Sequence, residues 1–150
     1  MHHIMLRAFL VLLGATPLLG KNPVIVPGWP TLPFPFSTAI VSAAGTIYIS
    51  GMQGVDFSKS PPSLVPGGIA AQTKQTLSNV QDVVNAAGGS MYDILECTVI
   101  LSDLKDFKAM NTEYAKFFTD GIPPARVAFQ APLAGGAAVE IKCTGEIVQG

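Results

Sequence analysis

Residues 121–133 read GIPPARVAFQAPL, and this stretch decides how the rest of the chain is interpreted. Two prolines end the preceding helical pattern, and an alternating run of small and apolar residues then predicts a short strand. That strand begins with Arg126, and the only other arginine of the chain is Arg7. An arginine in a mostly apolar strand marks a candidate functional residue.

Outward from this strand, the patterns predict two helices and further strands. Apolar residues recur at helical spacing in two segments, and the first of these ends at Gly88. The order ββαβαββ predicts an α+β domain in which two helices cover one face of a mixed sheet. The predicted elements are strands at 36–43 and 46–53, a helix at 69–87, a strand at 94–102, a helix at 104–119, and strands at 125–131 and 138–147, the last two joined by a Gly135-Gly136 turn.

The composition fits one domain and argues against several classes of function. Of the 150 residues 49% are hydrophobic and only 13% are charged, so we expect another subunit to cover part of the apolar surface. The net charge of -1 and the lack of a Lys/Arg run argue against general nucleic-acid binding. Both histidines lie within the first three residues and no CxxC occurs, which argues against a zinc site.

The first 32 residues form a hydrophobic and proline-rich segment, and the domain is expected to occupy 33–150. A 13-residue apolar run at 8–20 is too short for a transmembrane helix. An organelle presequence, a secretory signal and a misassigned start all remain open. The resulting expectation is a mitochondrial or cytoplasmic protein, with secretion as the alternative.

The two cysteines, Cys97 and Cys143, each lie inside an apolar run. A disulfide between them is possible in principle, but the pattern favours two buried reduced thiols.

Three polar residues do not fit the predicted core. If Val127 and Phe129 pack under the helices, the period of two places Arg126 on the uncovered face of the sheet, together with Glu140 of the last strand. An ordinary cross-strand ion pair would explain both. Asn111 interrupts the aromatic stripe of the second helix, where a structural role is the default. Packing of the uncovered face on another subunit would instead leave Arg126 in a cleft, suited to binding a carboxylate.

At these residues the chain resembles a known family. PPARVAFQAPL at 123–133, followed by VEIKCTGEI at 139–147, is similar to the signature region of the RidA/YjgF/UK114 family, the reactive-intermediate deaminases. Residues 47–54, 70–95 and 103–118 continue the match, so the resemblance is colinear over about 33–150.

The resemblance implies a chorismate-mutase-like fold, a homotrimer and sites in the clefts between subunits. It also implies hydrolysis of 2-imino acids, such as 2-iminopropanoate and 2-iminobutanoate, to 2-oxo acids and ammonia. This chemistry needs neither a metal nor an organic cofactor.

The family's site residues fall on specific positions of this chain. The resemblance implies that Arg126 binds the substrate carboxylate, that Glu140 positions water and the imine, and that Ser50, Gly51 and Asn111 line the site. Two further positions depart from many bacterial members: Phe36 stands where they have tyrosine, and Ala128 stands where they have cysteine, as in animal-type sequences.

Two other functions remain open. An endoribonuclease or translation inhibitor is one, although the domain has no histidine and a single arginine. A non-catalytic trimer that binds small carboxylates and regulates other enzymes is the second, because binding alone would use the same arginine.

Overall fold

The computed structural model describes residues 20–31, 33–119 and 121–147. Of the apolar run at 8–20, only Gly20 is among the described residues. The presequence and signal interpretations concern residues outside the described ranges. Within the described ranges no helix is both long enough and apolar enough to cross a membrane.

The main elements confirm the predicted order ββαβαββ, in which β2, β3, α1, β7, α2, β8 and β9 are the seven members. Short 3-10 turns flank α2 on both sides, so the second predicted helix is regular only in its middle. The elements are β1 (Asn22–Pro23), β2 (Ala39–Val41), β3 (Thr46–Ile49), β4 (Met52–Gln53), β5 (Val55–Asp56), β6 (Ser63–Leu64), α1 (Gly68–Ala86), β7 (Ile94–Leu101), α2 (Phe107–Tyr114), β8 (Ala125–Gln130) and β9 (Val139–Glu146).

The main sheet has the strand order β1-β2-β3-β9-β7-β8, and β4 pairs with β9. Among the described strands only β7 and β8 run parallel, and the strand order places β8 at an edge of the sheet. The last two strands are joined through the Gly135-Gly136 turn as predicted, but they are not neighbours in the sheet, because β7 lies between β8 and β9. A helix-containing connection is what allows β8 to run parallel to β7, as parallel pairs require.

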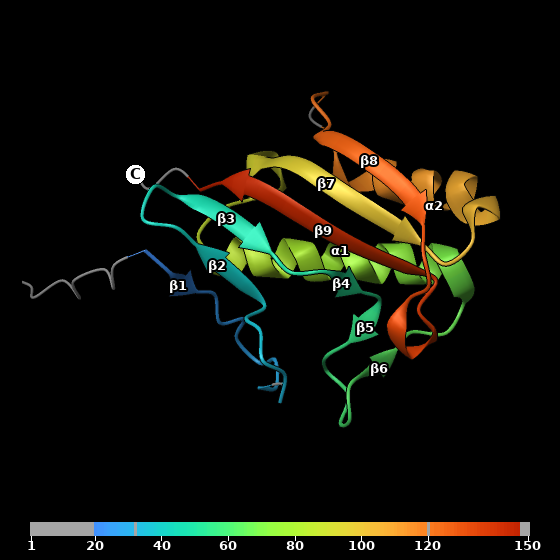
Figure 1. The fold of residues 1–150 in the computed structure, drawn as a ribbon, viewed down its shortest axis with the longest axis horizontal. Coiled ribbons are helices and arrows are strands. Elements are labelled where there is room, and N and C mark those ends of the chain that lie inside the picture. Colours follow the sequence, from blue (N-terminus) through green and yellow to red (C-terminus); the bar gives the residue numbers. More distant parts are fainter. Residues whose placement is uncertain (1–19, 32, 120, 148–150) are drawn as a thin grey trace, which may run out of the picture.

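Both helices lie behind one face of the sheet and pack against each other (Figure 1). The buried face of α1 carries Leu77, Val80, Val83 and Val84, and all four side chains are fully inaccessible to solvent. They meet alternate residues of β9, which are buried from Val139 to Gly145 at every second position. None of the described elements covers the opposite face of the sheet, which we call the uncovered face.

Two amides of α1 fix the edge of the sheet that carries β4. Asn79, which is 1% exposed, donates from Nδ2 to the carbonyl oxygens of Gln53 and Val55, at 3.0 and 2.9 Å. Gln72 accepts a hydrogen bond from the backbone N–H of Ala138 at 2.8 Å. These bonds satisfy buried backbone groups that would otherwise be costly, and they set the positions of β4 and of the start of β9.

Cys97 and Cys143 form a disulfide, so the prediction that favoured free thiols is wrong. The two residues are directly opposite each other on β7 and β9, with their Cα atoms 4.2 Å apart, and both are fully buried. Strand adjacency was the missing information, because two cysteines far apart in sequence bond only when the sheet register brings them face to face.

Residues 21–31, within the segment assigned above to the N-terminal region, pack against the sheet. β1 pairs with β2, and the backbone N–H of Val24 donates to the carbonyl of Ala39 at 2.9 Å. Val24 and Val26 are buried, and the Trp29 ring stacks on Phe57 with 4.0 Å between centroids.

Candidate active site

Arg126 lies on the helix-covered side of the sheet, which corrects the predicted face. In the parallel register Arg126 is the partner of Cys97, whose side chain points into the core. The alternation was correct but its phase was reversed, since Val127 and Phe129 lie on the uncovered face and are 51% and 43% exposed. The prediction placed the larger apolar side chains, Val127 and Phe129, under the helices. It failed because β8 is an edge strand that the helices cover only in part.

Two aromatic rings of α2 hold the guanidinium of Arg126. Its Cζ atom lies 4.6 Å from the centroid of the Tyr114 ring and 5.8 Å from that of Phe107. Such cation–π contacts orient the group without neutralising it. None of the ion pairs among the described residues includes Arg126. The donors of the guanidinium are therefore available to an anion.

Two polar atoms of α2, the helix whose rings contact Arg126, lack a partner. Asn111 Oδ1 and the Tyr114 hydroxyl are both buried, and neither has a hydrogen-bond partner among the described residues. Buried polar atoms are normally satisfied, so an unpaired acceptor and an unpaired hydroxyl indicate a missing partner. Burial raises the pKa of Tyr114 to about 12, against a smaller lowering effect of Arg126, so the hydroxyl keeps its proton at neutral pH. We call Arg126, Asn111 and Tyr114 the arginine cluster.

Glu140 lies on the opposite, uncovered face of the sheet. Its partner in β4 is Gln53, and Gln53 Nε2 donates to Glu140 Oε2 at 2.9 Å and to the carbonyl of Ala134 at 3.3 Å. The other carboxylate oxygen lies against the α-carbon of Gly51, where a Cβ would collide with it. Gly51 thus leaves room for the carboxylate, and Gln53 fixes its orientation.

Ser50 and Phe36 lie beside these residues. The Ser50 hydroxyl donates to the carbonyl of Ser37 at 2.7 Å, which ties the end of β3 to the segment that carries Phe36. Both residues line an open pocket of about 520 Å³ on the uncovered face. We call Glu140, Gln53, Ser50, Gly51 and Phe36 the glutamate cluster.

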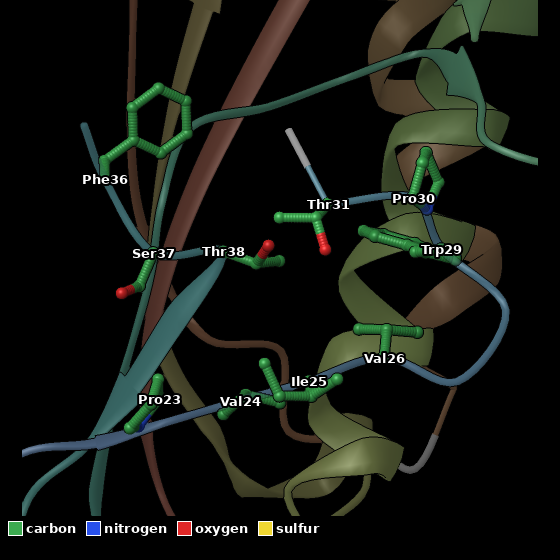
Figure 2. A pocket seen from close by; sticks show the side chains of 10 residues that line it. All are labelled: Pro23, Val24, Ile25, Val26, Trp29, Pro30, Thr31, Phe36, Ser37 and Thr38. Carbon is green, nitrogen blue, oxygen red and sulfur yellow. The ribbon is translucent and has the colours of Figure 1, made fainter. Parts of the chain in front are cut away.

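A second, smaller cavity of about 210 Å³, which also has Phe36 in its wall, lies between the 23–31 segment and the start of β2 (Figure 2). It is lined mainly by apolar side chains, together with the residues Thr31, Ser37 and Thr38. No charged side chain lines this cavity, which distinguishes it from both clusters.

The structure therefore brings the predicted residues together as two groups rather than one. Phe36, Ser50, Gly51 and Glu140 lie on the uncovered face, whereas Arg126 and Asn111 lie on the helix side at the β8 edge. Ala128 is on the helix side as well and packs partly buried against the core. A same-face pairing of Arg126 with Glu140, and hence the cross-strand ion pair, is excluded within one chain.

Sequence reasoning missed Tyr114 and Gln53. Tyr114 belongs to the apolar stripe of the second helix, so the sequence pattern indicates a core residue. Its site role is indicated only by the structure, in which its ring contacts Arg126 and its hydroxyl has no partner. Gln53 ends a β-rich run, and its role follows from the β4–β9 register. The described residues contain no group of three or more His, Cys, Asp or Glu side chains arranged to hold a metal ion.

Comparison with known proteins identifies the family. The family model described as Endoribonuclease L-PSP matches residues 30–147. The chain belongs to this family, which includes YjgF and RidA. A relative from Mus musculus named 2-iminobutanoate/2-iminopropanoate deaminase is 42% identical over 109 residues, which are 72% of this chain and 78% of the relative.

Solved structures of this YjgF/RidA family share the fold. The crystal structure of a protein named as an endoribonuclease L-PSP from Entamoeba histolytica superimposes with a TM-score of 0.77 at 34% identity, covering 85% of this chain and 99% of that one. The structure of E. coli TdcF with bound serine gives a TM-score of 0.76 at 27% identity, covering 85% and 100%. The likeness confirms the predicted mixed sheet with two helices on one face.

Proposed function

We propose that the protein hydrolyses 2-imino acids to 2-oxo acids and ammonia, at clefts where the arginine cluster of one subunit meets the glutamate cluster of the next. The observation that carries the proposal is the uncommitted guanidinium of Arg126, held by aromatic rings beside two unpaired polar atoms. A planar guanidinium with free donors is suited to bidentate binding of a carboxylate. Relatives of about this similarity carry the deaminase name, and the related TdcF binds serine, which also has a carboxylate.

The proposed site is shared because the two clusters lie on opposite faces of one sheet. No substrate of a few carbon atoms reaches both within a single chain. Val127, Phe129 and Tyr48 are 51%, 43% and 51% exposed on the uncovered face, and such an apolar surface favours burial against another copy. A contact between the two different clusters repeats around a closed ring, and the family resemblance implies that this ring has three subunits.

The chemistry needs positioning and one proton acceptor. A protonated imine is electrophilic at C2, so a water molecule attacks there while Glu140 accepts a proton from it. Glu140 then returns this proton to the amino nitrogen of the carbinolamine and takes up the proton of its hydroxyl group as the C2–N bond breaks, so ammonia leaves and the 2-oxo acid remains. Arg126 holds the carboxylate throughout, and the Gln53 bond keeps Glu140 in place.

The direct test is the hydrolysis of 2-iminopropanoate, generated in the assay by an amino-acid oxidase acting on alanine. The wild-type protein is expected to accelerate loss of the imine, measured by its competition with semicarbazide trapping. Glu140→Gln is expected to lower the rate about 100-fold, because general base catalysis contributes on this order. Glu146→Gln is the matched control, since Glu146 lies on the same strand and face. Equal rates for wild type and Glu140→Gln would contradict the assigned role.

Gly51→Ala provides an independent test of the glutamate cluster. The new methyl group would collide with the Glu140 carboxylate, so the carboxylate must move. We expect a loss of at least about 10-fold in kcat/KM with little change in thermal stability, because Gly51 is exposed and misplacement of a catalytic group by about 1 Å is costly. An active Gly51→Ala variant would show that Glu140 does not need this space.

No feature of the described residues specifically supports the hypothesis of a ribonuclease. The arginine cluster offers a single cation on an exposed strand, and phosphate-binding surfaces normally use several.

A further inference from the structure

We infer that the preferred substrates are 2-imino dicarboxylates, in which Lys142 binds the second carboxylate. This inference rests on the proposed function and names its substrate class. It follows from a pocket that carries two lysines and no acidic residue, next to the glutamate cluster.

The pocket of about 520 Å³ on the uncovered face is the place where the second carboxylate would bind. Phe36 and Ser50, two members of the glutamate cluster, form part of its wall. Lys142 enters from β9, two residues after Glu140 and on the same face, so their side chains are about 7 Å apart along the strand. Lys21 enters from the segment before β1.

The charge of this pocket is one-sided. Its remaining lining residues are Pro35, Ser37, Ile40, Tyr48 and Ile49, none of which is acidic. None of the ion pairs among the described residues includes Lys21 or Lys142. The nearest carboxylate on the strand, Glu140, is already hydrogen-bonded to Gln53. Two ammonium groups on the wall of one open pocket, with no acidic residue among its lining, therefore favour an anion from outside the chain.

The geometry gives each substrate group its own partner. Arg126 of a neighbouring subunit holds the carboxylate next to C2, and Glu140 serves the imine carbon. A substituent on C3 then extends along β9 toward Lys142. With 2-iminobutanedioate, water adds at C2, the C2–N bond breaks, and the products are 2-oxobutanedioate and ammonia. A monocarboxylic imino acid places only a methyl or ethyl group near the lysine and gains nothing from its charge.

The test compares two imines made in the assay, 2-iminobutanedioate from aspartate and 2-iminopropanoate from alanine, each by a matching amino-acid oxidase. Wild type is expected to prefer the dicarboxylate by about 10-fold or more in kcat/KM, since a hydrogen bond to a charged group contributes on this order. Lys142→Gln is expected to remove this preference through KM while changing the alanine-derived imine by less than about 2-fold, within the range of a peripheral substitution. Lys142→Arg should retain the preference, and Lys74→Gln, on an exposed site of α1, is the matched control.

Three results would overturn the inference. A wild-type preference for 2-iminopropanoate is the first, and an equal loss on both substrates in Lys142→Gln is the second. If wild type hydrolysed neither imine, the proposed function would be wrong. The assignment of the pocket to a second carboxylate would then be tested by ligand binding alone. In that case calorimetry should detect succinate but not propionate, with the succinate signal lost in Lys142→Gln. Equal binding of succinate by wild type and variant is the third contrary result.

Discussion

Arg126→Ala is expected to lower kcat/KM for 2-iminopropanoate by about 1,000-fold, because a lost carboxylate anchor removes both binding and orientation. The fold should persist, since Arg126 lies on an exposed edge strand and forms no ion pair among the described residues. Arg126→Lys keeps the charge but loses the bidentate geometry, so it should recover only part of the rate. The deaminase assay and circular dichroism together measure these effects.

The same variant tests whether neighbouring subunits share each site. Arg126→Ala and Glu140→Ala are each expected to be inactive alone. In trimers assembled from an equal mixture of the two, every mixed ring has one cleft with both wild-type groups, so about a quarter of all clefts should be active. The readout is recovery of activity after co-refolding, with each variant refolded alone as the control. Inactive mixed trimers would indicate that each chain supplies both groups to its own site.

If Arg126→Ala kept full activity on 2-iminopropanoate, the carboxylate-anchor hypothesis would be abandoned. If the Arg126→Ala variant kept full activity on the alanine-derived imine but had none on the aspartate-derived imine, Arg126 would instead be assigned to binding the second carboxylate. These two outcomes separate the function of the arginine from that of Lys142.

Reduction of the Cys97–Cys143 disulfide is expected to lower the free energy of unfolding by about 4 kcal/mol. The bond closes a loop with a sequence separation of 46 residues, and chain-entropy arguments assign about this value to a loop of that length. Denaturant unfolding with and without a reducing agent measures this difference in free energy. Reduction breaks the disulfide without replacing any residue. The double variant Cys97→Ala, Cys143→Ala controls for the reagent, since its stability should not respond to reduction.

Alkylation under denaturing, non-reducing conditions tests directly whether the disulfide is present. Both cysteines should resist labelling, and the intact mass should rise by two hydrogens on reduction. Two alkylated thiols in the denatured, unreduced protein would show that the bond does not form in solution.

The order of elements was predictable because each main helix and strand has its own local pattern. The spacing of Leu77, Val80 and Val84 defines α1, and Gly88, at a φ of 87°, ends it as the pattern predicts. The alternation in β9 is equally plain, with Val139 and Ile141 buried on one side and Glu140 on the other. These are short-range signals that the sequence carries directly.

Strand neighbours and faces depend on long-range pairing, and here the prediction failed. The insertion of β7 between β8 and β9 determines the position of Arg126, and it also brings Cys97 opposite Cys143. Hydrophobicity placed Val127 and Phe129 inside, although both are exposed in a single chain. An apolar face that another copy covers has the same composition as a core, so one sequence does not distinguish them.

The pairing of β1 with β2 limits where the chain can be cut by a processing protease. Val24 and Val26 are buried, and burial of each valine contributes about 1.5–3 kcal/mol. Cleavage after Val26 would remove both, and it would also uncover the backbone of β2 at the margin of the sheet. A cut before Lys21 would spare the strand and the lysine that lines the pocket. A processing cut that preserves the pairing of β1 with β2 is therefore expected to lie before Asn22.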